Sequence, residues 1–213
     1  MNVNEKISDS LLISTAILIL VNIILLYGVT YRGWNVTTVL FAYWLESAVV
    51  GFYTVLRMIQ AGGVPSTGSR IVGLIFLIPF FFLHFGLFMA VHYFLITSSF
   101  GGPRILSWEI AVIITLLLIS HGASHYLNYL RGGEFLTTDP KTQMGRPYPR
   151  IIIMQFVIIF GGFLIFSERV AFQAIMIVVI GKIAVDAITH FIMHYRAMKR
   201  VAVSSEVELA TDN

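Results

Sequence analysis

The sequence contains no cysteine at any of its 213 positions. This absence excludes disulfide bonds, thiolate zinc sites, iron–sulfur clusters and cysteine nucleophiles. Any bound metal ion would therefore be held by nitrogen and oxygen ligands. The absence does not identify the redox compartment of the protein.

Charge is also scarce, because Asp, Glu, Lys and Arg together make up 12% of the chain. A typical soluble domain has about twice that share. The net charge of +3 is small, and no basic tract is interleaved with aromatic residues, so nucleic-acid binding is not expected. Hydrophobic residues make up 57% of the chain, which favours one compact membrane bundle.

Long apolar runs take the place of charge. A helix needs roughly 20 apolar residues to cross the hydrocarbon core, and these runs neither alternate nor have the short length of membrane strands. The first run reaches span length without a small-residue cleavage motif, so a cleaved signal peptide is not expected. Six transmembrane helices are predicted: Leu11–Val29, Val36–Gln60, Ile71–Ile96, Trp108–Leu130, Ile151–Phe166 and Val170–Tyr195.

Lys and Arg are distributed unequally between the two ends of these spans. Ten lie on the face that holds both termini and three on the opposite face. By the positive-inside rule, both termini are expected to be cytoplasmic. The sequence thus predicts an all-α, six-span bundle in the cell membrane over residues 1–200, followed by a disordered polar tail over 201–213.

The longest connector, Arg131–Arg150, is rich in Gly, Thr and Pro and is expected on the cytoplasmic side. It ends in GRPYPR (Gly145–Arg150), which could position a cytoplasmic lid, whereas its prolines alone indicate only a stiff turn.

Ionisable residues inside the predicted spans form the main functional signal. Such groups cost several kcal/mol each in a bilayer and are kept where they face the bundle interior and have partners. Every histidine of the chain falls inside a span, as do Glu46, Lys182 and Asp186. The six histidines are His84, His92, His121, His125, His190 and His194.

Their spacing places several of them on shared helix faces. His121 and His125 are one helical turn apart, and the last span has Lys182, Asp186, His190 and His194 in steps of four. Two histidines one turn apart can bind one metal ion. At about 1.5 Å per residue, most of these groups come within reach of the bilayer centre from several different helices.

The sequence therefore predicts one intramembrane site for a divalent metal ion, zinc first and iron as the alternative. Glu46 is expected to act as a further ligand or general base, and Ser124 is a candidate catalytic residue beside it. The expected ligands are His84, His121, His125, Asp186, His190 and His194.

Simpler roles compete with metal binding. His92 is predicted to form a hydrogen bond between helices rather than to bind a metal. Lys182 and Asp186 could form a buried ion pair, which would remove Asp186 from the ligands. Proton relay or structural hydrogen bonding would also account for the paired histidines.

Five segments resemble a family of uncharacterised prokaryotic integral membrane proteins, and this resemblance implies a multi-span fold and no known activity. They are YWLES (Tyr43–Ser47), HFGLFMAVH (His84–His92), SHGASHYLNY (Ser120–Tyr129), GRPYPR and DAITHFIMH (Asp186–His194).

Two characterised groups are partly similar. Gly122–His125 looks like the Gly-x-Ser-Gly motif of rhomboid proteases, but His125 replaces the final Gly and Ser124 falls toward the opposite membrane face. His190 and His194 are similar to the last-span HxxxH of intramembrane zinc hydrolases such as alkaline ceramidases. Those enzymes have one span more, and their Ser-to-His spacing is not evident here.

The expected function is that of a metal-dependent hydrolase acting on a lipid or another membrane-embedded substrate, because an open zinc site activates water. Iron would instead favour oxidation of a lipid chain. A metal-ion or proton transporter is the main alternative. A b-type haem held by His84 and His121 is a further alternative.

Overall fold

The structure, a computed structural model, describes residues 27–63, 66–99 and 106–166, with Leu20, Ile23, Ile24 and Pro103 in addition. Most of the predicted first span and all of the predicted last span lie outside the described residues. Four residues with predicted roles belong to that last span and therefore lie outside the described residues: Lys182, Asp186, His190 and His194.

The described residues are helical, and no strand occurs among them, so the predicted all-helical fold class is confirmed for this part of the chain. Three helices are long and apolar enough to cross a membrane, over Thr37–Gln60, Gly68–Ser98 and Trp108–Leu130. The elements are α2 (Val36–Gln60), α3 (Thr67–Ser99), α4 (Ser107–Ser124), the π-helical segment η1 (His125–Leu130), α5 (Glu134–Thr137), α6 (Pro140–Gly145) and α7 (Tyr148–Phe166).

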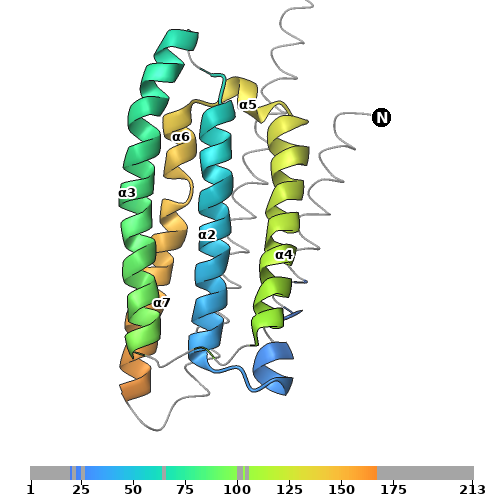
Figure 1. Ribbon diagram of the computed structural model, residues 1–213, viewed down its shortest axis with the longest axis vertical. Coiled ribbons are helices and arrows are strands. Elements are labelled where there is room, and N and C mark those ends of the chain that lie inside the picture. The colour runs from blue at the N-terminus through green and yellow to red at the C-terminus, as the bar shows by residue number, and fades with distance from the viewer. Residues whose placement is uncertain are drawn as a thin grey trace, which may run out of the picture.

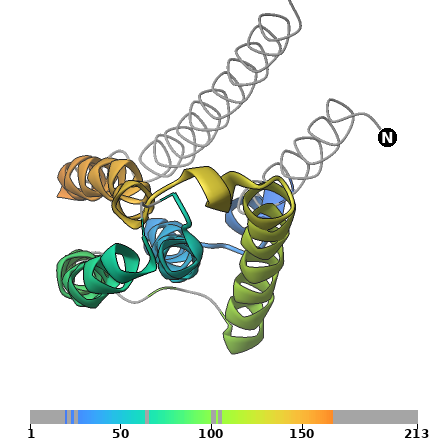
Figure 2. The same ribbon diagram turned by 90° about the horizontal axis from the view of Figure 1, so that it is seen from above.

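Helix α2 is the centre of the described bundle. It lies between α4 on one side and α3 with α6 and α7 on the other (Figures 1 and 2), and it contacts all four. Leu40 and Met154 belong to the apolar cluster on the α3–α7 side, and Leu45 and Leu117 to the cluster on the α4 side. Because α2 is covered from both sides, several of its polar residues are buried, among them Thr38, Glu46 and Ser47.

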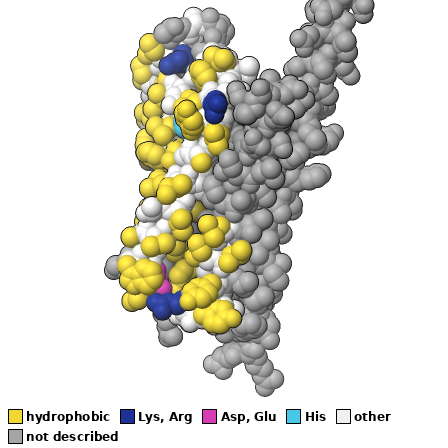
Figure 3. Space-filling view, turned by 90° about the vertical axis from the view of Figure 1, so that its right-hand side faces the viewer, with side chains coloured by type: hydrophobic (Ala, Val, Ile, Leu, Met, Phe, Trp, Pro, Cys, Tyr) yellow, Lys and Arg dark blue, Asp and Glu magenta, His cyan; other side chains and the backbone are white. Residues whose placement is uncertain are grey.

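The outer surfaces of the bundle are apolar over most of their length. Helix α3 exposes large hydrophobic side chains, including Phe76, Leu83 and Phe94. On the face drawn in Figure 3, charged side chains of the described residues lie near the two ends and apolar ones between them. This distribution suits helices that pass through a hydrocarbon layer.

Helices α6 and α7 form one interrupted helix. Figure 1 shows them following one another along α2 and α3. Pro147 and Pro149 cause the interruption, because proline lacks the backbone N–H and disfavours helical geometry in the preceding residue. Asp139 caps the start of α6 by accepting hydrogen bonds from the Thr142 hydroxyl (2.6 Å) and backbone N–H (3.0 Å), which hold the pKa of Asp139 below its usual value.

The GRPYPR segment runs along the bundle, with Pro147 buried, Tyr148 and Arg150 partly buried and the other three residues exposed, and its role as a cytoplasmic lid stays a prediction. Helix α6 packs against both α2 and α3, and Gln143 of α6 is fully buried. Tyr148 and Arg150 then contact residues in the middle of α3 and α2. The connector thus returns into the bundle before α7 begins.

The junction between α2 and α5 provides a test of this arrangement. The Gly63 N–H donates to the Thr138 carbonyl oxygen at 2.9 Å, and a Cβ atom at Gly63 would lie 2.7 Å from the Thr137 carbonyl carbon. Because backbone atoms cannot move aside cheaply, we expect Gly63→Ala to lower the free energy of unfolding by about 1–3 kcal/mol. Thermal unfolding in detergent measures this loss.

Gly73→Ala is the matched control, because a Cβ atom at Gly73 would meet nothing within 4 Å. We expect it to leave the unfolding midpoint unchanged or slightly raised, since alanine favours helix over glycine. Equal losses in both variants would contradict the described packing of α5 on α2.

Candidate functional site

Glu46 is a buried carboxylate near the middle of α2, with 7% of its side chain exposed. At about 1.5 Å per residue it lies roughly 15 Å from one end of that helix and roughly 20 Å from the other. A carboxylate so far from both ends of an apolar helix requires a charged or hydrogen-bonding partner.

Arg150, at the start of α7, is that partner. Its Nη2 atom lies 2.6 Å from Glu46 Oε2, and its Nε donates a hydrogen bond to Ser47 Oγ at 3.2 Å. Its guanidinium carbon lies 4.6 Å from the ring centroid of Tyr43. Tyr43 and Ser47 flank the ion pair on α2, so one helix supplies the counter-charge, the stacking ring and a hydroxyl acceptor.

These contacts use the specific properties of arginine. A planar guanidinium can pair with a carboxylate, donate at its edge and stack on an aromatic face at the same time, which an ammonium group cannot do. Separating a buried pair of this kind leaves an uncompensated charge and costs about 3–5 kcal/mol. The pair therefore holds the first turn of α7 against the centre of α2.

His121 of α4 approaches the same carboxylate from the other side of α2. Its Nε2 atom lies 3.9 Å from Glu46 Oε1, and 28% of its side chain is exposed. This separation is too long for a direct hydrogen bond but short enough for a charge interaction when the imidazole is protonated. Two of the predicted site residues, Glu46 and His121, thus lie together, with Arg150 as a third member.

His125 and Ser124 lie further along the same helix. His125 is buried, and its ring centroid lies 5.5 Å from that of Tyr53 and 5.4 Å from that of Tyr129. Ser124 Oγ accepts a hydrogen bond from the Asn128 side chain at 3.3 Å. Among the described residues Ser124 has no histidine partner, so a serine–histidine pair could come only from residues outside that part.

His84 and His92 of α3 contact α7 instead. His84 Nδ1 lies 2.9 Å from the Tyr148 hydroxyl, and His92 Nε2 lies 2.7 Å from Gln155 Oε1. The hydrogen bond between helices predicted for His92 is therefore confirmed. Because α2 lies between α3 and α4 (Figure 2), His84 and His121 turn to different partners, an arrangement unlike that of two axial ligands of one haem.

The described residues contain no group of three or more His, Asp or Glu side chains that could hold a metal ion. Glu46 and His121 supply two ligand-type groups. The other expected ligands, Asp186, His190 and His194, lie outside the described part, so the predicted metal site stays a prediction.

Sequence reasoning identified Glu46 and His121 but missed Arg150 and Tyr148. Both were assigned to a cytoplasmic turn because GRPYPR combines two prolines with two arginines. One feature of the sequence could have indicated Arg150. Glu46 lies in the middle of a span, and the described spans offer no basic residue at the same depth. Arg150, next to the prolines that interrupt a helix, was the nearest candidate for its partner.

The profile of one protein family matches residues 5–203. The chain belongs to DUF6498, a family of unknown function. This confirms the resemblance to an uncharacterised family. No curated protein and no solved structure shows a match to the chain. Because the function of DUF6498 is unknown, membership assigns no activity to the chain.

The ion pair predicts a non-additive pattern of stability. We expect Arg150→Gln to lower the free energy of unfolding by about 3–5 kcal/mol, because it leaves Glu46 charged and buried. The double variant Glu46→Gln with Arg150→Gln should recover much of that loss, since both charges are gone. Thermal unfolding in detergent measures the wild type, Glu46→Gln, Arg150→Gln and the double variant.

Arg32→Gln is the control, because Arg32 pairs with Glu109 at 3.0 Å but has 41% of its side chain exposed. Its loss should be smaller than that of Arg150→Gln, because Arg32 is partly exposed and the buried Glu109 carboxylate keeps its hydrogen bond from the Leu106 N–H at 3.0 Å. Additive losses in the double variant would contradict a direct interaction between Glu46 and Arg150.

Proposed function

We propose that this chain is a multi-pass membrane transport protein in which Glu46, between Arg150 and His121, binds and releases a proton. The observation that carries the proposal is the Glu46–Arg150 ion pair, formed beside the interruption between α6 and α7. Ionisable residues inside crossing helices mark ion and proton pathways, and interrupted helices in membrane proteins surround transport sites.

The proposal includes the full predicted topology. Six spans with both termini in the cytoplasm account for the six apolar runs and for the excess of Lys and Arg on one face. Three described helices with the length and apolarity needed to cross a membrane support the multi-span part. Interrupted backbone is tolerated at membrane depth when protein or a hydrated cavity surrounds it, and Gln143 and Pro147 are buried in this way.

Glu46 couples proton binding to the position of α7. Arg150 carries a permanent charge, whereas the imidazole of His121 is a group that can donate a proton to a carboxylate. A proton that moves from His121 Nε2 to Glu46 Oε1, through one water molecule or a side-chain rotation, leaves His121 and Glu46 neutral. Arg150 then loses its counter-charge, which favours movement of the first turn of α7 away from α2.

The charges favour a proton over a divalent metal ion. Arg150 already neutralises the one carboxylate of the described centre. A divalent cation at Glu46 and His121 would add two positive charges next to a buried guanidinium, at a large Coulomb cost in an apolar interior. A proton adds one positive charge, which neutralises the Glu46 carboxylate and so removes the attraction that holds Arg150.

Proton flux through the purified protein tests this proposal. We expect proteoliposomes loaded with a pH-sensitive dye to take up protons when valinomycin and a potassium gradient impose a membrane potential. Glu46→Gln should reduce the uptake at least tenfold, because the amide cannot carry the proton. Glu134→Gln, which removes a carboxylate at the end of the bundle, should retain wild-type uptake. Wild-type uptake equal to that of empty liposomes, or full uptake by Glu46→Gln, would reject the proposal.

A metal-dependent hydrolase acting on a lipid or membrane-embedded substrate is the second candidate, supported by the approach of His121 to Glu46. Zinc, or iron as the alternative, would take Glu46, His121 and the sequence-predicted ligands of the last span. Such a metal would supply Lewis-acid activation of water, and Glu46 would accept the proton as general base where it is not itself a ligand.

Elemental analysis separates the two candidates. A hydrolase should retain about one zinc or iron ion per chain after dialysis against a chelator, and His121→Ala combined with His190→Ala should lose it. His92→Gln is the control, because His92 already has Gln155 as its partner. Wild-type protein without stoichiometric metal would exclude the second candidate and leave the proton-flux result unaffected.

A further inference from the structure

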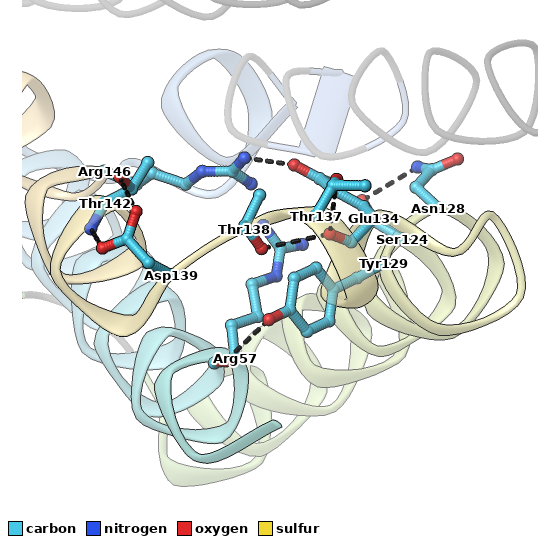
Figure 4. Close-up of polar contacts among 10 residues, drawn as sticks. All are labelled: Arg57, Ser124, Asn128, Tyr129, Glu134, Thr137, Thr138, Asp139, Thr142 and Arg146. Atoms are coloured by element: carbon cyan, nitrogen blue, oxygen red, sulfur yellow. Dashed lines mark hydrogen bonds and ion pairs between the residues drawn. The ribbon is translucent and has the colours of Figure 1, made fainter. Parts of the chain in front are cut away.

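A second charged cluster lies at the C-terminal end of α2, where α2, η1 and α5 meet (Figure 4). The Tyr129 hydroxyl donates to the Arg57 carbonyl oxygen at 2.7 Å, and the Arg57 guanidinium carbon lies 5.4 Å from the Tyr129 ring centroid. Segment η1 is π-helical, a conformation that is rare and frequent at functional sites. It brings both Tyr129 and His125 to face α2.

The cluster has more positive than negative charge. Arg146 pairs with the Glu134 carboxylate, and both lie close enough to Arg57 to act on its charge. Arg57 itself forms no ion pair within 4 Å among the described residues, and its buried Nε has no hydrogen-bond partner there. The cluster thus has two guanidinium groups and one carboxylate, which pairs with the partly exposed Arg146.

His125 adds an unsatisfied polar group next to this cluster, with its ring centroid 5.4 Å from that of Tyr129. Its residue exposure is 6%, its Nδ1 atom has no hydrogen-bond partner among the described residues, and the charge of Arg57 acts on it. A buried polar atom without a partner costs about 1–3 kcal/mol. Arg57 and His125 therefore both offer nitrogen atoms that an anion could satisfy, whereas Arg57 and Arg146 repel a cation.

We propose that Arg57, Arg146 and His125 form a binding site for a phosphate group. Phosphate suits the cluster because guanidinium groups bind its oxygens in pairs, and a tetrahedral anion accepts donors from several directions. The exposed side chains of Arg131 and Lys141 lie in the adjoining segments and add positive charge at this end of the bundle. Basic sites between helices at a membrane surface bind phospholipid headgroups, so the phosphate belongs to an anionic lipid or to a free compound.

Glu134 acts as the internal competitor of this phosphate. The Thr137 and Thr138 hydroxyls donate to its carbonyl oxygen at 3.2 and 3.1 Å, which fixes the short helix α5 in place (Figure 4). Its carboxylate occupies Arg146 while the site is empty. A bound phosphate takes over Arg146, so removal of the Glu134 charge strengthens phosphate binding.

The test uses the purified full-length chain and its thermal unfolding midpoint. One arm titrates inorganic phosphate in detergent against chloride at equal ionic strength. The other arm compares nanodiscs of phosphatidylglycerol with nanodiscs of phosphatidylcholine. We expect stabilisation of the wild type in at least one arm, an apparent affinity about tenfold weaker or more in Arg57→Gln, and a tighter affinity in Glu134→Gln.

Arg131→Gln is the matched control, because it removes the same charge from an exposed position at the same end of the bundle. It should change the response little. Stabilisation by phosphate supports a free phosphate compound as the source, and stabilisation by phosphatidylglycerol alone supports a lipid headgroup. The absence of both responses, or equal effects of Arg57→Gln and Arg131→Gln, overturns the proposal.

If Arg57→Gln does not fold, Glu134→Gln provides the test. A purely structural ion pair between Glu134 and Arg146 predicts a weaker or unchanged affinity for the phosphate group in this variant, whereas competition predicts a tighter one. This site is independent of proton transport at Glu46, and neither result changes the interpretation of the other.

Discussion

The ion pair between Glu46 and Arg150 constrains the whole described fold. An isolated charge in an apolar bundle is costly, so each member of the pair requires the other. Arg150 meets this requirement only because the chain returns into the bundle through α5 and α6 before α7 begins. Two prolines then stop α6 and let α7 start at the level of Glu46, so the interruption of the helix and the charge pair are one structural solution.

Helix α2 can hold a charged group in its middle because it is covered on both sides. Glu46 connects it to α7 through Arg150 and to α4 through His121. Further along, the carbonyl oxygen of Arg57 connects it to Tyr129 of η1. The two clusters have opposite requirements: at Glu46 the charges balance and a proton can disturb them, whereas at Arg57 the positive charge is in excess. One helix thus organises a neutral centre in its middle and a basic site at its end.

The sequence predicted the bounds of individual helices but not the contacts between residues that are distant in the chain. Val36–Gln60 was predicted with the bounds that α2 has, because one apolar run of span length follows Asn35, whose side chain caps the helix. Glu46 stood out by its chemistry within that run. Arg150 did not, since it lies at a boundary where arginine usually marks the membrane surface, and its partner is more than a hundred positions away in the sequence. Contacts of this kind depend on the path of α5 and α6, which no apolar pattern encodes.

Imidazoles inside an apolar bundle need partners, but the described partners are not shared. His84 forms a hydrogen bond with Tyr148 and His92 with Gln155, and the Glu46 carboxylate lies near His121. These partners are separate, so a common metal ion does not follow from the number of buried histidines alone. The Nδ1 atoms of His92 and His125 both lack a hydrogen-bond partner among the described residues, and His125 differs because the charge of Arg57 acts on it. The sign of the surrounding charge, rather than the histidine itself, decides which ligand such a position can accept, and there it favours an anion.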